Sequence, residues 1–146
     1  MTQRGSEPVP DELTFEHIGA RRIVAKPAAI DAVTWPTGTI ALRIADDDVL
    51  LIGDDTTDIT DITDITVADE HAIISDDAGW SGIWLTSAQA ESIALHHIHW
   101  PLPPQRPILA QGLIAAIPAK VWLGADDKAL LLVATVSVDE MQERLS

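Results

Sequence analysis

Short apolar runs separated by aspartates are the feature that most limits how this chain can fold. Asp46-Asp47-Asp48, Asp76-Asp77 and Asp126-Asp127 each interrupt such runs. No run approaches the roughly 18 apolar residues that a membrane-spanning helix needs. Runs of this kind favour strands and short helices joined by turns. The sequence therefore predicts an α+β protein made mostly of antiparallel sheet, with two helices and no membrane partner.

Charge and composition narrow the choice of partners. The 146 residues carry 23 acidic and nine basic side chains, a net charge of −14, and no Lys or Arg occurs between Arg43 and Arg106. Nucleic acids and anionic membranes bind clustered basic residues, so both are excluded as partners. The chain has no cysteine, which excludes disulfides, thiolate metal sites and cysteine nucleophiles. Residues 1–8 have no apolar stretch typical of a secretion signal, which predicts a cytoplasmic protein.

The first half of the chain is expected to be rich in strands. Residues 1–13 are polar and predict a flexible leader, and residues 14–146 predict a single α+β domain. In the β-rich part, residues 14–70, apolar patterns predict one or two strands over 14–25 and a hairpin over 39–52.

An Asp-Ile-Thr triplet occurs three times in succession over residues 58–66. A period of three fits neither a strand nor an α-helix. A polyproline-II or 3₁₀ path would instead place every isoleucine on one side. The expected role of this acidic segment is a connector held to the core by its isoleucines.

The second half, residues 71–146, predicts the order β-α-β-β-β-α. Two strand segments, 71–74 and 83–85, are expected around a turn at residues 76–79, and three more strands are expected over 108–116, 119–123 and 129–133. Thr86 and Gln89 have the spacing of a capping box that begins a helix, and Ser137 and Glu140 have the same spacing before the terminal helix. Four prolines between Trp100 and Pro107 predict an extended crossover.

The end of the first predicted helix carries the most suggestive side chains for binding. His97, His99, Trp100 and Arg106 are candidate ligand-binding residues, and His96, His97 and His99 are weak candidates for a metal site. Helical metal ligands are usually spaced i, i+4, whereas these histidines are adjacent or two apart. The alternative is that they cap helix carbonyls or pack against the core.

No motif predicts catalysis or a bound cofactor. Gly79-Trp80-Ser81-Gly82 is one residue short of the G-x-S-x-G nucleophile elbow, and no glycine-rich phosphate loop is present. Acidic pairs placed in turns are expected to be solvated and ionised. We therefore expect no catalytic residue and no cofactor.

Three segments carry a resemblance to a known family: residues 83–90, 110–122 and 129–133, with 41–53 upstream. Residues 71–145 resemble the first domain of the aminomethyltransferase (glycine-cleavage T-protein) superfamily, and more closely the gamma subunit of heterotetrameric sarcosine oxidase. The resemblance implies the fold and a non-catalytic accessory role. Folate is the ligand that it implies for the family, but no residue here matches the family's acidic anchor or catalytic aspartate.

The sequence thus supports two functional hypotheses. The first is a non-enzymatic accessory or assembly subunit, similar to that gamma subunit, which forms a homo-oligomer or joins a larger oxidase subunit. The second is a stand-alone protein that binds a folate-like small molecule or a metal near residues 96–100.

Overall fold

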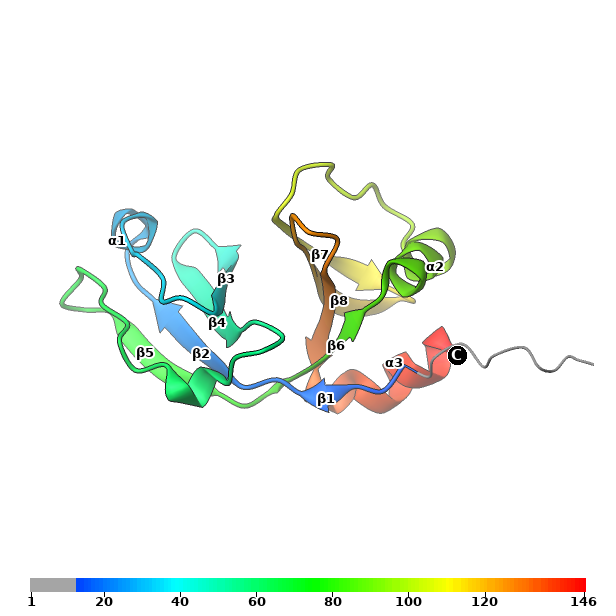
Figure 1. The fold of residues 1–146 in the computed structure, drawn as a ribbon, viewed down its shortest axis with the longest axis horizontal. Helices are drawn as coiled ribbons and strands as arrows, with labels where there is room; N and C mark the ends of the chain where they lie inside the picture. The colour runs from blue at the N-terminus through cyan, green and yellow to red at the C-terminus, as the bar shows by residue number, and fades with distance from the viewer. Residues whose placement is uncertain (1–12) are drawn as a thin grey trace, which may run out of the picture.

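The structure is a computed structural model that describes residues 13–146. Of the predicted leader, residues 1–13, only Leu13 lies within this range. The described residues form two sheets, which Figure 1 shows in the middle of the molecule with helices on either side. The predicted α+β class, mostly antiparallel sheet, is confirmed.

The order of the elements along the chain can be followed in Figure 1 by colour, from blue at the N-terminal end to red at the C-terminus. The four-stranded sheet has the order β3-β4-β2-β5 and the five-stranded sheet has the order β1-β6-β9-β8-β7. The strands are β1 (Glu16–His17), β2 (Ala20–Val24), β3 (Thr39–Ala45), β4 (Asp48–Gly53), β5 (Ile73–Asp77), β6 (Trp80–Leu85), β7 (Ile108–Ile114), β8 (Ile117–Leu123) and β9 (Ala129–Ala134). Among the described helices, three are α-helical, α1 (Pro27–Asp31), α2 (Ser87–His97) and α3 (Val138–Leu145), and two are 3₁₀ turns, η1 (Ile59–Asp61) and η2 (Thr135–Ser137).

The chain crosses between the two sheets twice. β1 pairs with β6 in the five-stranded sheet, and β5 pairs with β2 in the four-stranded sheet. The predicted turn at residues 76–79 is therefore wrong. Asp76 and Asp77 belong to β5, opposite Arg21 and Ala20 of β2, and the short link that follows carries the chain into the other sheet.

The hairpins follow the sequence pattern more closely. The β3–β4 hairpin is confirmed, with its turn at Asp46 and Asp47. β7 ends at Ile114 rather than at residue 116, because Ala115 and Ala116 form the turn to β8 with φ angles of 52° and 66°. Alanine rarely adopts positive φ, so nothing in the sequence signals this turn.

The core between the sheets is formed by alternate residues of the two central strands. Leu50 and Ile52 of β4 meet Leu130 and Leu132 of β9 in a buried cluster completed by Ala20 and Leu42, which we call the inter-sheet core. The residues between them point the other way, since side chains alternate along a strand. β4 and β9 are therefore buried on both faces. The molecule has four layers, which are α1, the four-stranded sheet, the five-stranded sheet, and the pair of helices α2 and α3.

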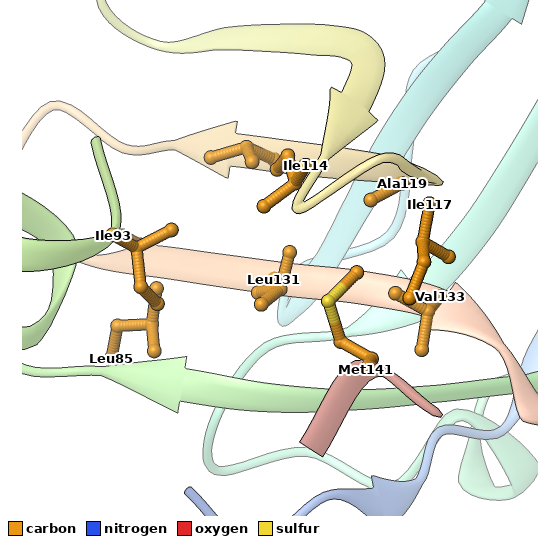
Figure 2. Close-up of a cluster of buried hydrophobic side chains, with 10 residues drawn as sticks. Leu85, Ile93, Ile114, Ile117, Ala119, Leu131, Val133 and Met141 are labelled. Atoms are coloured by element: carbon orange, nitrogen blue, oxygen red, sulfur yellow. The ribbon is translucent and has the colours of Figure 1, made fainter. Parts of the chain in front are cut away.

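A second core lies between the five-stranded sheet and helices α2 and α3. Figure 2 shows Ile93 of α2 beside Leu85, and Met141 of α3 beside Leu131 and Val133. The capping box of α2 is confirmed, with the Thr86 hydroxyl accepting from Gln89 N and the Gln89 side chain accepting from Thr86 N. The one predicted at Ser137 is wrong, because the 3₁₀ turn η2 leads into α3 and the Ser137 side chain makes no cap.

The outer face of the four-stranded sheet is covered by α1 and by the Asp-Ile-Thr segment. Helix α1 was not predicted, since five residues beginning at Pro27 are too few to show a helical period. The 3₁₀ path is confirmed in part: η1 buries Ile59, and Ile62 and Ile65 pack partly buried against the same core. None of the helices within residues 13–146 has the length and apolar character that a membrane crossing requires.

The inter-sheet core should dominate the stability of the fold. We expect Leu130→Ala to lower the free energy of unfolding by about 2–5 kcal/mol, because it leaves a cavity between two rigid sheets. Leu95→Ala, at a side chain that is 75% exposed on α2, should change it by less than about 0.5 kcal/mol. Urea unfolding followed by circular dichroism measures both values, and equal effects would contradict this account.

Candidate functional site

The predicted ligand residues begin at the end of α2. His97 is half-buried, and its main-chain oxygen accepts a hydrogen bond from Ala115 N at 3.0 Å, which ties the helix end to the β7–β8 turn. Burial lowers the pKa of His97, and the nearby rings of His96 and His99 lower it further. The imidazole of His97 is thus held in its neutral form to a lower pH than an exposed histidine.

One of the two neighbouring histidines, His96, hydrogen-bonds to a helix carbonyl, as the capping alternative expects. In the tautomer with its proton on Nδ1, His96 donates to Ser92 O at 2.9 Å, one helical turn back. The rings of His96 and His97 lie 6.3 Å apart, and His99 is exposed. Within residues 13–146 no group of three or more His, Cys, Asp or Glu side chains could hold a metal ion.

Trp100 and Arg106 lie at opposite ends of the proline crossover. Trp100 Nε1 donates to Leu113 O at 2.7 Å, and its ring lies directly over Gly112 of β7. Arg106 precedes the other end of β7 and donates to the main-chain oxygens of Pro103 and Gln105. The structure therefore brings His97 and Trp100 to the same end of β7 but does not bring Arg106 to them. Ligand binding by these residues stays a prediction.

A polar cluster at the border of the inter-sheet core was missed by sequence reasoning. Arg22 of β2 donates through Nε and Nη2 to the two carboxylate oxygens of Asp48, both at 2.5 Å, and its Nη1 lies 3.7 Å from Asp77. Trp80 Nε1 donates to the same Asp77 oxygen, Oδ2, at 3.0 Å. The pKa of Arg22 is raised, first by its hydrogen bond to Asp48. These residues, which with Lys120 we call the inter-sheet cluster, join β2, β4 and β5 of one sheet to β6 of the other.

Lys120 of β8 completes this cluster. Its ammonium nitrogen lies 5.1 Å from the centre of a Trp80 ring and donates to Gln111 Oε1 at 2.7 Å. Gln111 in turn donates to Ile44 O of β3 at 3.2 Å, so the contact spans both sheets. The signal for this site was strand alternation, which places Arg22 on the same face as Ala20. The alternation pattern indicates a polar site only when it is known which face of β2 packs against the other sheet.

One open cavity lies on the outer side of the four-stranded sheet. It has a volume of about 360 Å³ and lies between the end of α1 and the Asp-Ile-Thr segment. Its lining is mostly small or apolar and includes one carboxylate, and consists of Ala29, Ala32, Val33, Thr34, Asp64, Thr66 and Ala68. No charged side chain faces Asp64 across it among these lining residues.

Strand β5 forms an open edge of the four-stranded sheet. In the described part of the chain it pairs with β2 on one side and with no strand on the other. Ile73 and Ile74 of this strand are 61% and 43% exposed, on opposite faces. Unpaired main-chain groups flanked by exposed apolar side chains are the features of a strand that pairs with another chain.

Comparison with known proteins identifies the fold. The described architecture is a two-sheet α+β fold, and it is similar to that of a chain in the heterotetrameric sarcosine oxidase from Corynebacterium sp. U-96, solved in complex with pyrrole 2-carboxylate. The match has a TM-score of 0.63 and 17% sequence identity, and covers 94% of this chain and 84% of that one. No family model matches the chain, and no curated protein matches it. The resemblance to sarcosine oxidase is thus confirmed at the level of fold.

The contact between Trp100 and β7 gives a direct test of the crossover. A Cβ added at Gly112 would lie 2.7 Å from Trp100 Cε2, so Gly112→Ala should displace the indole and weaken its bond to Leu113. We expect a change in tryptophan fluorescence and a loss of about 1–3 kcal/mol of stability. Gly79→Ala, where the nearest atom to the added Cβ is 3.4 Å away, is the control. Equal stability of the two variants would contradict the contact.

The lowered pKa of His97 predicts a defined pH dependence. The unfolded chain takes up a proton at this histidine as the pH falls through about 6.5, and the folded chain does so only at lower pH. His97 should therefore reduce stability progressively from about pH 6.5 down to its folded-state pKa. Urea unfolding over this range should show a weaker fall in stability for His97→Gln than for the parent, and an equal fall in the two proteins would contradict the prediction.

Proposed function

We propose that this chain is a non-catalytic accessory subunit, which assembles with a larger enzyme subunit in the manner of the gamma subunit of heterotetrameric sarcosine oxidase. The observation that carries the proposal is the open β5 edge with its exposed isoleucines. It is supported by the fold likeness, which extends over nearly the whole chain to a component of a four-subunit oxidase.

The chemistry of the β5 edge defines the partner that it fits. An added strand would satisfy the free main-chain groups of β5 and would cover Ile73 and Ile74, one on each face. Burying an isoleucine side chain fully contributes about 1.5–3 kcal/mol. The strand of the partner should therefore be apolar opposite both isoleucines.

Charge adds a second requirement for the partner. The chain has a net charge of −14, and the side chain of Asp76 on β5 is 90% exposed although Arg21 lies 3.6 Å away. A second copy of an equally acidic chain would be repelled, whereas a basic surface would be attracted. We therefore infer that the partner is a different protein, with Lys or Arg beside the strand that pairs with β5.

The state of the acidic side chains supports a non-catalytic role. Asp48 and Asp77, the carboxylates of the inter-sheet cluster, each contact Arg22, and Asp77 also accepts from Trp80. The oxygens of these carboxylates are therefore taken up by groups of the fold, whereas the carboxyl group of a general acid must be free to reach the atom that it protonates. The cluster therefore fits a role in joining the two sheets.

The assembly can be tested by tagging the chain in its native cells and measuring the mass of the purified complex by light scattering. We expect a defined complex of fixed stoichiometry with a larger subunit that carries a redox cofactor visible in its absorption spectrum. Replacing Ile73 and Ile74 together by Asp should reduce recovery of that subunit at least about tenfold, which corresponds to 1.4 kcal/mol.

Leu95→Asp is the control, because it also places an Asp carboxylate at an exposed apolar position, on α2. It should leave the complex intact. A chain that remains a monomer in its native cells would overturn the accessory role. Recovery of an unchanged complex by the Ile73 and Ile74 variant would overturn the β5 edge as its interface.

A further inference from the structure

The three lysines of the chain, Lys26, Lys120 and Lys128, lie in three different environments. Lys26 is exposed at the start of α1. Lys128 is exposed and paired with Asp55 at 3.0 Å, with Asp126 at 3.9 Å. Lys120 is half-buried on the inner face of the five-stranded sheet, where it belongs to the inter-sheet cluster. The reactivity of the three lysine amines can therefore be compared within one protein.

Lys120 differs from an ordinary half-buried lysine in its partners. Among the described residues no carboxylate lies within 4.0 Å of its nitrogen, which contacts the Gln111 amide oxygen and the face of Trp80. Asp48, the carboxylate whose charge acts on Lys120, is already bound by Arg22 through Nε and Nη2. A buried ammonium is normally paired with an acid, so this amine is poorly compensated as a cation.

The charged groups around Lys120 shift its pKa in opposite directions. Burial lowers its pKa, and the guanidinium of Arg22 lowers it further, while Asp48 raises it by a smaller amount. For Lys128 the hydrogen bond to Asp55 raises the pKa. Because the pKa of Lys120 is lowered and that of Lys128 is raised, a larger fraction of Lys120 is in the neutral form at any pH below both pKa values. The neutral amine is the nucleophilic form.

We propose that Lys120 is the acyl-acceptor lysine of this chain, an amine between the two sheets that is modified by small activated acyl donors such as acyl phosphates. The site goes beyond the proposed assembly role and does not depend on it. Trp80 restricts the side chain, and the Gln111 oxygen accepts one of its protons, so that the amine is held in one place.

The reaction with acetyl phosphate is balanced without a further reactant. The neutral nitrogen of Lys120 attacks the acyl carbon and a C–N bond forms. The bond between the acyl carbon and the bridging oxygen breaks, inorganic phosphate leaves with that electron pair, and the nitrogen releases a proton to water. The product is a neutral amide, which removes one of the two cations, Lys120 and Arg22, from the inter-sheet cluster and ends the cation–π contact with Trp80.

The proposal can be tested by competition among the three lysines. Folded protein is treated with limiting acetyl phosphate at about pH 8, below the usual lysine pKa. It is then unfolded and fully acetylated with deuterated acetic anhydride, so that mass spectrometry reads the stoichiometry at each lysine. We expect Lys120 to be acetylated several times faster than Lys26, and Lys128 to be the slowest. In protein unfolded in urea before treatment, the three rates should converge.

A matched pair of variants tests the physical cause. Gln111→Glu places a carboxylate 2.7 Å from the Lys120 nitrogen in a side chain of the same size, and should slow its acetylation severalfold without affecting Lys26. Asp55→Asn removes the partner of Lys128 and should accelerate that lysine instead. The ranking in the parent protein does not depend on how either variant folds.

Lys120 reacting no faster than Lys26 in the folded protein would overturn the proposal. So would an unchanged Lys120 rate in a Gln111→Glu variant whose circular dichroism spectrum matches that of the parent. Both measurements use the isolated chain, so their failure is distinct from a failure of the assembly experiment.

Discussion

The contact between the inner faces of the two sheets is the interaction on which the rest of the structure depends. Leu50 and Ile52 of β4 pack there against Leu130 and Leu132 of β9, and all four are buried almost completely. Each side chain contributes about 1.5–3 kcal/mol on burial. The opposite faces of the same two strands form the cores that hold α1 and α2, so loss of the central contact would expose both sheets.

Polar groups at the border of this contact fix how the sheets meet. Hydrophobic burial has no direction, whereas the bidentate pair of Arg22 with Asp48 and the chain from Lys120 through Gln111 to Ile44 have a defined geometry. They also give the inner face its one poorly compensated cation among the described residues, at Lys120. The same cluster therefore links the stability of the fold to the reactivity of a single amine.

The β5 edge and the end of α2 differ in the chemistry of their exposed groups. The β5 edge offers apolar side chains and free main-chain groups, which suit an extended segment of another protein. At the end of α2, the main-chain oxygen of His97 and the indole of Trp100 are bound to the β7–β8 hairpin through Ala115 and Leu113. These contacts attach the crossover to the sheet, while ligand binding there stays a prediction and the β5 edge is the surface that we propose for a partner.

Local patterns in the sequence determined those elements whose signals lie close together in the chain. Alternation in residues 39–52 predicted the β3–β4 hairpin, the Thr86 and Gln89 pair predicted the start of α2, and four prolines predicted the crossover. Tertiary structure decided what depends on distant neighbours: β5 and β6 in different sheets, positive φ at Ala115, and Asp48 and Asp77 beside Arg22 rather than in solvent. The physical reason is that a strand's period of two specifies two faces but does not specify which strand pairs with it or which sheet covers it.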